Sequence, residues 1–509
     1  MKSKFKVLSL LTALAIAASM FAACGDKSGD TGSTAGTDTG SSGGDKPKEV
    51  VTLKWWHWGD PPKNPDKVIE ALNKKSAEDI GVKIDFIWAT GDDAKLKTAL
   101  STGADDDIAF TCSWFALYTD TAQKGQLCDI TDMLNDHPKL MEYIPEFVWE
   151  AAKVKGRIYA VPTFKDVAST NYWYCNKEYV FDQADAEEEF MAPGDRNSVK
   201  TPLMKKLYDY MKDGHPYPHD LTAPYTMNFQ GPRSPSVGDQ TVGSIWVIAE
   251  GDETYTLQYA YTTPNYMTDL KTLCEWYQAG YINQDCLQLQ KEPEFCIVNQ
   301  AAGWRGAEKS VWGVGKDYTV EICQRGKTQA STGTCLGSMQ GIFTNSKHPN
   351  ESLDFIEYMN LDATYRNMLG YGIEGENWEE NGDGTIKTLN TDWQPGLFSQ
   401  ATFFTLKPVT PAPATMYSDM EAEMRNAEKS VLLGFSPDMD SYKNENAAVT
   451  TVLEKFKYEL ACGTMKDPEA YAAQCLKECN AAGADKIRVE LQKQLDEFLK
   501  AKGIDVPTR

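Results

Sequence analysis

The hydrophobic pattern of residues 51–111 alternates between strand and helix periods, and this alternation restricts the fold more than any other feature. Strand-like stretches begin at Val51, Val82 and Asp107. Between them lie two segments, 64–81 and 93–101, whose apolar residues recur at helical spacing. Strand, helix, strand, helix, strand in this order indicates parallel pairing with right-handed crossovers. The sequence therefore predicts an α/β fold built on a doubly wound sheet flanked by helices.

An open α/β sheet binds ligands beyond the carboxyl ends of its strands, so the residues after each strand are candidates for a site. The stretch KWWHWGD ends the first strand. Its first two tryptophans lie inside the strand, where helices cover both faces, and we expect them to be core. Trp58 and Asp60 follow this strand, and Ser113 and Trp114 follow the strand that ends at Thr111. We expect these four residues at the ligand edge.

Length and charge limit the classes of function. A chain of 509 residues, 41% of them hydrophobic, is too long for a single core, so two or three domains are expected. The formal net charge is -22 at pH 7. A polyanion is bound by clustered Lys and Arg, so this charge would repel phosphate backbones. Nucleic acid is therefore not an expected partner.

The N-terminus predicts export. Residues 1–23 carry three lysines, an apolar run and then small residues, which is the pattern of a secretory signal peptide. The Phe-Ala-Ala-Cys ending at Cys24 resembles the lipobox of bacterial lipoproteins, and this resemblance implies lipid attachment at Cys24. The alternative is an ordinary cleaved signal. Residues 24–48 are nearly all Gly, Ser, Thr and Asp, so we expect a flexible linker with a reach of roughly 25–30 Å.

The remaining eleven cysteines and the histidines show no metal-site spacing. Export permits disulfides, but reduced and buried thiols are equally compatible with the sequence. No H-E-x-x-H, P-loop or dinucleotide fingerprint occurs in the part expected to fold. We therefore expect no cofactor, no metal and no catalytic residues, although abundant carboxylates leave a glycosidase pair open as an alternative.

A family resemblance rests on motifs spread along the chain. Residues 155–180 combine "YAVP" with an aromatic strand that ends in "YCNKEYV". This segment is similar to the first crossover between lobes in the extracellular solute-binding proteins of ABC importers, the class that includes maltose-binding protein. Residues 345–362 and 369–378 resemble the helix and loop after the return crossover, and 434–499 resembles the closing region of a lipoprotein branch of this class. The resemblance covers about residues 1–500.

The resemblance implies two lobes, each a sheet flanked by helices, joined by a hinge that the chain crosses about three times. We place these crossings near Phe164, Thr334 and Pro411. Lobe one is then 49–165 with 336–408, and lobe two is 166–335 with 409–509.

Aromatic residues make up 11% of the chain, and several cluster in expected loops. A sugar ring stacks on an indole face, while carboxylates, amides and Arg bond its hydroxyls. Trp304 and Arg305 lie in a Gly-rich loop, although an Arg305–Glu308 surface pair is the alternative. The candidate ligand-binding residues are Trp58, Asp60, Ser113, Trp114, Asp166, Trp173, Trp304, Arg305, Tyr371, Glu374 and Trp378. For each aromatic residue, packing at the top of a helix remains the alternative.

We therefore expect a lipid-anchored, monomeric binding protein on the outer face of a bacterial cell membrane. It would capture a carbohydrate, in particular an oligosaccharide, by hinge closure and deliver it to the permease subunits of an ABC transporter. A peptide or another small solute in the same fold, a surface carbohydrate-active enzyme and a sensor partner are the alternatives. Asp166 beside the hinge, and Tyr371 with Glu374 in the loop that the resemblance turns toward the cleft, would contact the ligand.

Overall fold

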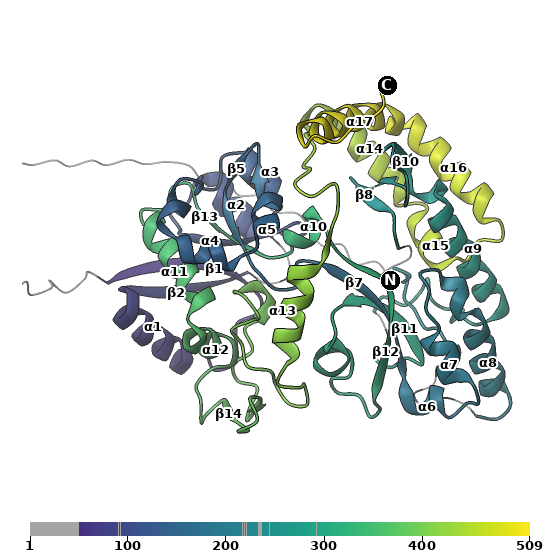
Figure 1. The fold of residues 1–509 in the computed structure, drawn as a ribbon, viewed down its shortest axis with the longest axis horizontal. Helices are drawn as coiled ribbons and strands as arrows, with labels where there is room; N and C mark the ends of the chain where they lie inside the picture. The colour runs from purple at the N-terminus through teal and green to yellow at the C-terminus, as the bar shows by residue number, and fades with distance from the viewer. Residues whose placement is uncertain are drawn as a thin grey trace, which may run out of the picture. The chain divides into compact units, whose positions relative to one another are not determined.

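A computed structural model describes residues 50–89, 91, 93–215, 217, 219, 221–232, 237–243, 245–291 and 293–508 (Figure 1). The signal peptide, Cys24 and the linker lie outside these residues. The first sheet has the order β2-β1-β3-β13-β6. Its strands are β1 Val51–Trp58, β2 Val82–Ala89, β3 Ile108–Thr111, β6 Ala160–Pro162 and β13 Met339–Ile342. Strand β1 runs parallel to β2 and β3, as predicted, whereas β13 is antiparallel to β3 and β6.

The first sheet forms as the alternating periods predict. Helices α1 (Asp66–Ile80) and α2 (Ala94–Thr102) occupy the two expected segments. Trp55 is fully buried in the core beside the sheet, while Trp56 is partly buried and its Nε1 donates to Asp106 Oδ2 at 2.8 Å. The structure corrects one boundary. Strand β1 continues through Trp58 because its parallel partner β2 extends to Ala89.

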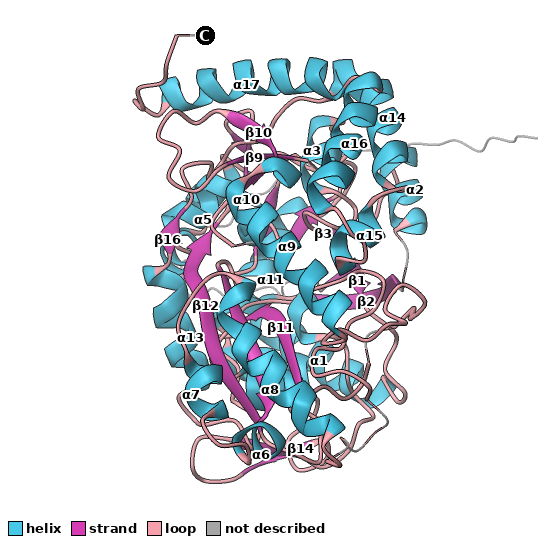
Figure 2. Ribbon diagram, turned by 90° about the vertical axis from the view of Figure 1, so that its right-hand side faces the viewer, coloured by secondary structure: helices cyan, strands magenta, loops and turns pink. Residues whose placement is uncertain are grey.

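The second sheet has the order β11-β7-β12-β16 and is mixed. Its strands are β7 Ser169–Asn176, β11 Val298–Gly303, β12 Val320–Ala330 and β16 Glu428–Lys429. Strand β7 is antiparallel to both neighbours. Helices α8 (Thr201–Lys212) and α9 (Pro264–Ala279) pack on one face of this sheet, in front of β11 and β12 in Figure 2. The core between them contains Trp173, Trp276 and Leu207.

A third core lies under the C-terminal helices. It joins a three-stranded sheet, β10-β9-β8, to α14, α16 and α17. These elements are β8 Gln240–Val242, β9 Trp246–Ile248, β10 Leu257–Tyr259, α14 Lys443–Leu453, α16 Pro468–Ala481 and α17 Ala484–Ala501. The helical spacing of Ile487, Leu491 and Leu495 predicts their role correctly, since all three are fully buried.

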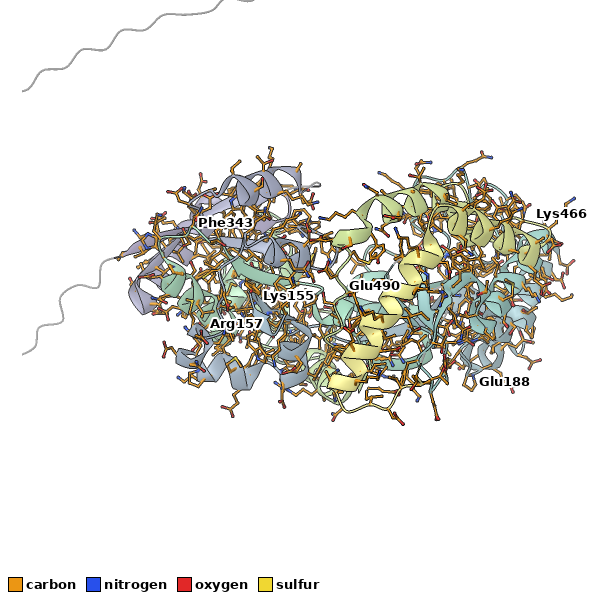
Figure 3. The ribbon with its side chains drawn as sticks, turned by 90° about the horizontal axis from the view of Figure 1, so that it is seen from above. Lys155, Arg157, Glu188, Phe343, Lys466 and Glu490 are labelled. Atoms are coloured by element: carbon orange, nitrogen blue, oxygen red, sulfur yellow. The ribbon has the colours of Figure 1, made fainter. Side chains whose placement is uncertain are left out.

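The other elements connect these layers. They are α3 Tyr118–Gln123, α4 Pro138–Tyr143, α5 Glu146–Ala151, β4 Lys153–Val154, β5 Arg157–Ile158, α6 Lys177–Phe181, α7 Ala186–Met191, α10 Thr332–Cys335, α11 Pro349–Leu361, α12 Ala363–Tyr371, β14 Trp378–Glu380, β15 Ile386–Thr388, α13 Met416–Asn426 and α15 Lys457–Cys462. Charged side chains such as Glu188 and Lys466 are exposed, whereas Phe343 is buried (Figure 3). No helix among the described residues is both long and apolar enough to cross a membrane.

The chain passes from one large sheet to the other three times. The first two passages are residues 163–168, between β6 and β7, and residues 331–338, between β12 and β13. The third lies near 427, because Met420 and Met424 of α13 pack in the core of the first sheet and β16 then pairs with β12.

The three passages are hydrogen-bonded to one another. The Thr163 N–H donates to Ser338 O at 2.9 Å, and Thr334 Oγ1 donates to Val167 O at 2.8 Å. The Gly434 N–H, just after the third passage, donates to Thr332 Oγ1 at 2.9 Å. These hydrogen bonds connect the three passages to one another in one bundle of segments. Strands of both large sheets end next to this bundle.

The eleven described cysteines are free thiols, and all but Cys128 are buried. The structure therefore favours the reduced and buried alternative for this part of the chain.

We predict that His57 makes the protein less stable in mild acid. Its side chain is fully buried among the rings of Trp55, Phe86 and Trp88. Burial lowers the pKa of His57 from its ordinary value of 6.5 to about 3, and the Arg366 charge adds to the shift. The unfolded chain binds this proton below pH 6.5 but the folded chain does not, so stability falls as pH drops from 6.5 toward 3.

The measurement is urea unfolding of the wild type and of His57→Phe at pH 7.0 and pH 5.5. The wild type should lose about 1 kcal/mol more than the variant between these values, because one proton is taken up only on unfolding. An equal loss in both proteins would contradict the prediction.

Candidate ligand-binding site

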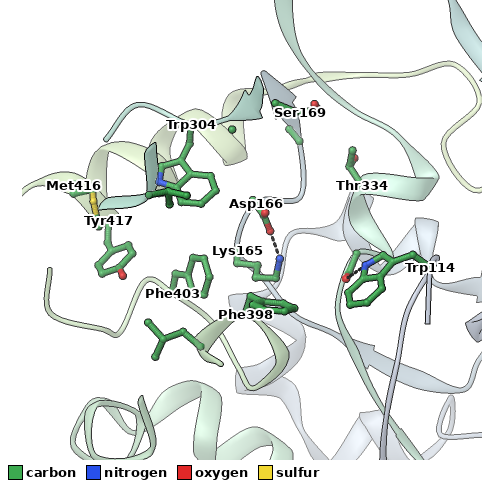
Figure 4. A pocket seen from close by; sticks show the side chains of 16 residues that line it. Trp114, Lys165, Asp166, Ser169, Trp304, Thr334, Phe398, Phe403, Met416 and Tyr417 are labelled. Carbon is green, nitrogen blue, oxygen red and sulfur yellow. Dashed lines mark hydrogen bonds and ion pairs between the residues drawn. The ribbon is translucent and has the colours of Figure 1, made fainter. Parts of the chain in front are cut away.

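A pocket of about 580 Å³ lies at the passages, where residues from both sheets meet. Figure 4 shows its side chains. The passages supply Lys165, Asp166, Ala168, Thr334 and Gly337. Walls from four other segments complete the lining: Trp114; Ser169; Ala302, Gly303, Trp304 and Val311; and Leu397, Phe398, Phe403, Met416 and Tyr417.

One wall is built on the first sheet. Trp114 follows β3, is 50% exposed, and donates from Nε1 to Gly337 O at 3.0 Å, which fixes the indole against the second passage. Phe398 lies beside it, with ring centroids 6.3 Å apart. Trp58 supports both, since its ring centroid lies 5.5 Å from that of Trp114 and 4.9 Å from that of Phe398. We expected residues that follow a strand to lie at the ligand edge of the sheet. In this wall Trp114 lines the pocket, and Trp58 packs behind Trp114.

The opposite wall follows β11 of the second sheet. Trp304 and Val311 line the pocket, and Val311 belongs to a π-helical turn, Glu308–Trp312. The turn is anchored by Trp312, which stacks on Tyr174 with centroids 5.1 Å apart and an angle of 14°. A Cβ at Gly303 would lie 2.7 Å from the Trp312 ring, so glycine is needed for this packing. The loop thus holds the Trp304 ring at the pocket.

The charged groups of this pocket sit on the first passage. Lys165 is nearly buried, pairs with the Asp166 carboxylate, and has its Nζ 5.6 Å from the centre of the Phe403 ring. Asp166 is more exposed and borders the pocket. Burial raises the pKa of the Tyr417 phenol, and it raises the pKa of the Cys112 thiol behind Trp114 to about 11, so both groups stay neutral at physiological pH.

Helix α13 ties the pocket to both sheets. Its first residues, Met416 and Tyr417, line the cavity. Further along, Glu423 Oε1 accepts hydrogen bonds from Thr170 Oγ1 at 3.0 Å and Thr328 Oγ1 at 2.7 Å, on β7 and β12. The helix that packs on the first core is therefore hydrogen-bonded to the second sheet.

A second cavity of about 710 Å³ adjoins the first and shares Ser169 and Thr334 with it. Its lining is polar and includes four carboxylates and one lysine, namely Asp195, Asp239, Glu250, Glu428 and Lys327. Lys327 pairs with Glu428 at 3.3 Å. Together these two neighbouring cavities, one lined by aromatic and the other by polar residues, are the groove.

Three of the sequence-predicted residues, Trp114, Asp166 and Trp304, line the aromatic cavity. Ser113 lines neither cavity, but its Oγ donates at 3.1 Å to the carbonyl of Gly333, which lines the polar cavity. Trp58 does not line the aromatic cavity but packs behind Trp114 and Phe398.

The other predicted residues lie elsewhere. Asp60, Arg305 and Glu374 are exposed and line neither cavity. Tyr371 and Trp378 line a separate pocket of about 380 Å³ that shares Leu397 with the aromatic cavity.

Trp173 is withdrawn as a ligand contact. It is fully buried, with ring centroids of Tyr225 and Trp276 about 6 Å away, so no solute reaches it in this conformation. The alternation of residues along this strand did not indicate which of its two faces is covered by other elements.

Sequence reasoning missed Phe398, Phe403, Met416 and Tyr417, and the whole polar cavity. Phe398 and Phe403 come from a stretch without a regular hydrophobic period, whereas Met416 and Tyr417 begin helix α13, and only the tertiary fold brings all four together. Among the described residues, no three His, Cys, Asp or Glu side chains form a cluster able to hold a metal ion. The groove offers ring faces and hydrogen-bonding groups, which suits a polyhydroxylated solute.

Comparison with known proteins agrees with this geometry. Residues 431–500 match a family described as "Domain of unknown function (DUF3502)". Over 507 residues the chain is 27% identical to a protein of Streptococcus pneumoniae serotype 4 (strain ATCC BAA-334 / TIGR4) named "Carbohydrate ABC transporter substrate-binding protein". The match covers 96% of this chain and 97% of that protein.

Solved structures show the same fold. The N-glycan transport solute binding protein NgtS from Streptococcus pneumoniae matches with a TM-score of 0.78 at 24% identity, over 89% of this chain and 99% of that chain. NgtS in complex with Man5GlcNAc matches at 0.68, also at 24% identity and with the same coverage. An HMO binding solute binding protein from Bifidobacterium longum infantis ATCC 15697 matches at 0.62 and 14% identity, over 89% and 99%.

The expected two-lobe α/β fold and the resemblance to solute-binding proteins are thereby confirmed. The homologue and these neighbours are binding proteins of transporters, not enzymes.

We predict that Trp114 and Trp173 differ sharply in their contribution to stability. Trp114→Ala should cost less than about 1.5 kcal/mol, because half of the side chain is already exposed. Trp173→Ala should cost about 3–5 kcal/mol, because it leaves a cavity in the second core. Urea unfolding of the two variants measures both values, and equal losses would show that the exposed indole is a core residue after all.

Proposed function

We propose that this chain is the extracellular solute-binding component of an ABC importer and that it captures a neutral oligosaccharide. The observation that carries the proposal is the groove between the two sheets, whose aromatic cavity presents Trp114 and Trp304 and shares Ser169 and Thr334 with the neighbouring polar cavity. Rings would stack on sugar faces, while the polar cavity would bond hydroxyls. Two adjoining cavities hold a chain of sugar rings better than a single ring.

The charge distribution favours a neutral ligand. The polar cavity has four carboxylates against one lysine, and the lysine is already paired. A uronate or another acidic sugar would meet like charge here, which costs binding free energy. The homologue's name and the NgtS complexes with sugars support carbohydrate as the ligand class.

Closure about the passages would capture the sugar. A ligand that contacts Trp114 on one side and Trp304 on the other favours the closed state by its differential affinity for that state. We propose the lobe division at the passages, with α13 on the side of lobe one. The permease subunits would then bind the closed protein.

The anchor is also part of the proposal. A substrate-binding protein of an ABC importer acts outside the membrane, and the Cys24 lipobox would hold this one at the cell surface as a monomer, through at least two acyl chains. The linker at 24–48 would give the folded part its reach to the permease.

We predict that the protein lacking residues 1–48 binds Man5GlcNAc, the sugar of one NgtS complex, more tightly than mannose or N-acetylglucosamine. A ligand at 100 times its Kd stabilises the folded state by about 2.7 kcal/mol, so thermal unfolding shifts upward. Calorimetric titration supplies the affinities, and tetragalacturonate serves as the acidic comparison.

Trp114→Ala and Trp304→Ala should each weaken binding by about tenfold, because one stacked ring contributes about 1 kcal/mol or more. Trp114→Phe is the matched control and should retain most of the affinity. The proposal fails if no saccharide shifts the melting temperature while a peptide or an organic acid does. New reducing ends after incubation would instead indicate a carbohydrate-active enzyme.

A further inference from the structure

The pocket wall formed by Leu397, Phe398 and Phe403 stands on an irregular stretch of backbone. Residues 395–407 contain one short 3-10 turn, Leu397–Ser399, and no strand. Much of this stretch is buried: Ser399, Gln400 and Thr402 are fully so. A buried carbonyl without a donor is costly, and this stretch has no helix or sheet ladder to supply donors.

Arg366 on α12 supplies them. Its Nε donates to Thr402 O at 2.8 Å, and one Nη donates to Leu397 O at 3.1 Å and to Ala401 O at 3.4 Å. The other Nη donates to Gln400 Oε1 at 2.7 Å. Every acceptor belongs to the stretch that carries the pocket wall.

This guanidinium is unusual because it is buried without a counter-ion. Arg366 is fully buried, and within the described part of the chain no Asp or Glu forms an ion pair with it. Besides the acceptors named above, its charge faces the phenols of Tyr143, Tyr371 and Tyr417 and the imidazole of His57. Burial lowers the pKa of Arg366 to about 10, so it remains a cation at physiological pH.

A buried unpaired charge lowers stability unless every donor is satisfied, and a hydrophobic residue of similar volume would be the simpler core. The planar fork of arginine can hold several carbonyls in fixed directions at once, which neither lysine nor an apolar residue can do. The role of this cation is therefore to hold these carbonyls in fixed positions.

Neighbouring amides extend the same support. Gln340 on β13 donates from Nε2 to Ser399 O at 2.8 Å and Gln400 O at 3.0 Å, and accepts from Trp55 Nε1 at 3.0 Å. Asn367 on α12 donates to Thr405 O at 2.8 Å. Arg366 is the charged centre of this network.

We propose that Arg366 is a positioning residue for the ligand pocket: it fixes the backbone of 397–402, sets the wall of Leu397, Phe398 and Phe403, and thereby determines how tightly the saccharide fits. The part about fit rests on the proposed function. Arg366 itself lines neither cavity.

The test compares Arg366→Lys with Asn73→Ala. Asn73 on α1 bonds both backbone groups of Ile84 on β2, so its loss lowers the stability of the first sheet while the donors to the wall at 395–407 stay in place. Gln400→Ala, which removes one acceptor of the guanidinium, is a milder second variant that keeps the experiment decisive if Arg366→Lys does not fold.

Amide hydrogen exchange of residues 396–406 is the direct readout, and the affinity for Man5GlcNAc is the functional one. In Arg366→Lys these amides should exchange about tenfold faster or more, and the affinity should fall by about tenfold, because several buried carbonyls lose their donor. In Gln400→Ala the same changes should be smaller. In Asn73→Ala both quantities should stay within about twofold of wild type despite a lower melting temperature.

Unchanged exchange of 396–406 in both Arg366→Lys and Gln400→Ala would overturn the proposal. So would an equal loss of affinity in Asn73→Ala, since that would be a general effect of instability. If the wild type binds none of the saccharides, the proposed function fails, and hydrogen exchange alone then decides whether Arg366 holds the wall.

Discussion

The hydrogen bonds that join the three passages between the two large sheets are the interactions on which the rest of the structure depends. Thr163 with Ser338 and Thr334 with Val167 hold the first two together, and the bond between Gly434 and Thr332 adds the third. Because each passage also continues into a strand or helix of each core, the bundle places Trp114 and Trp304 on opposite sides of one groove. Without this bundle the two cores would have no fixed common boundary.

Some residues of the groove border the cavities, and others hold the backbone of the walls from behind. The rings and the Lys165–Asp166 pair border the cavity, while buried groups behind them hold the backbone in place. Glu423 bonds α13 to β7 and β12, and Arg366 bonds the wall at 397–402.

Local signals in the sequence predicted those parts of the structure that local physics determines. The alternating periods of 51–111 gave the parallel part of the first sheet, and the strand-end rule brought Trp114 to the pocket. The same rule predicted Asp60 at the ligand edge, but Asp60 is exposed and lines neither cavity. Trp173 shows a second limit, since a strand's period does not say which face a distant helix covers. Phe398, Phe403 and the polar cavity depend on contacts between segments hundreds of residues apart.

The central claim is that a neutral oligosaccharide occupies the groove between the two sheets. A crystal structure of residues 49–509 grown with Man5GlcNAc tests it most directly. The account predicts density for the sugar in the aromatic cavity, with a ring face against Trp114 or Trp304 and a hydroxyl within hydrogen-bonding distance of Asp166. Sugar density outside the groove, or an empty groove at a sugar concentration that saturates binding in solution, would contradict it.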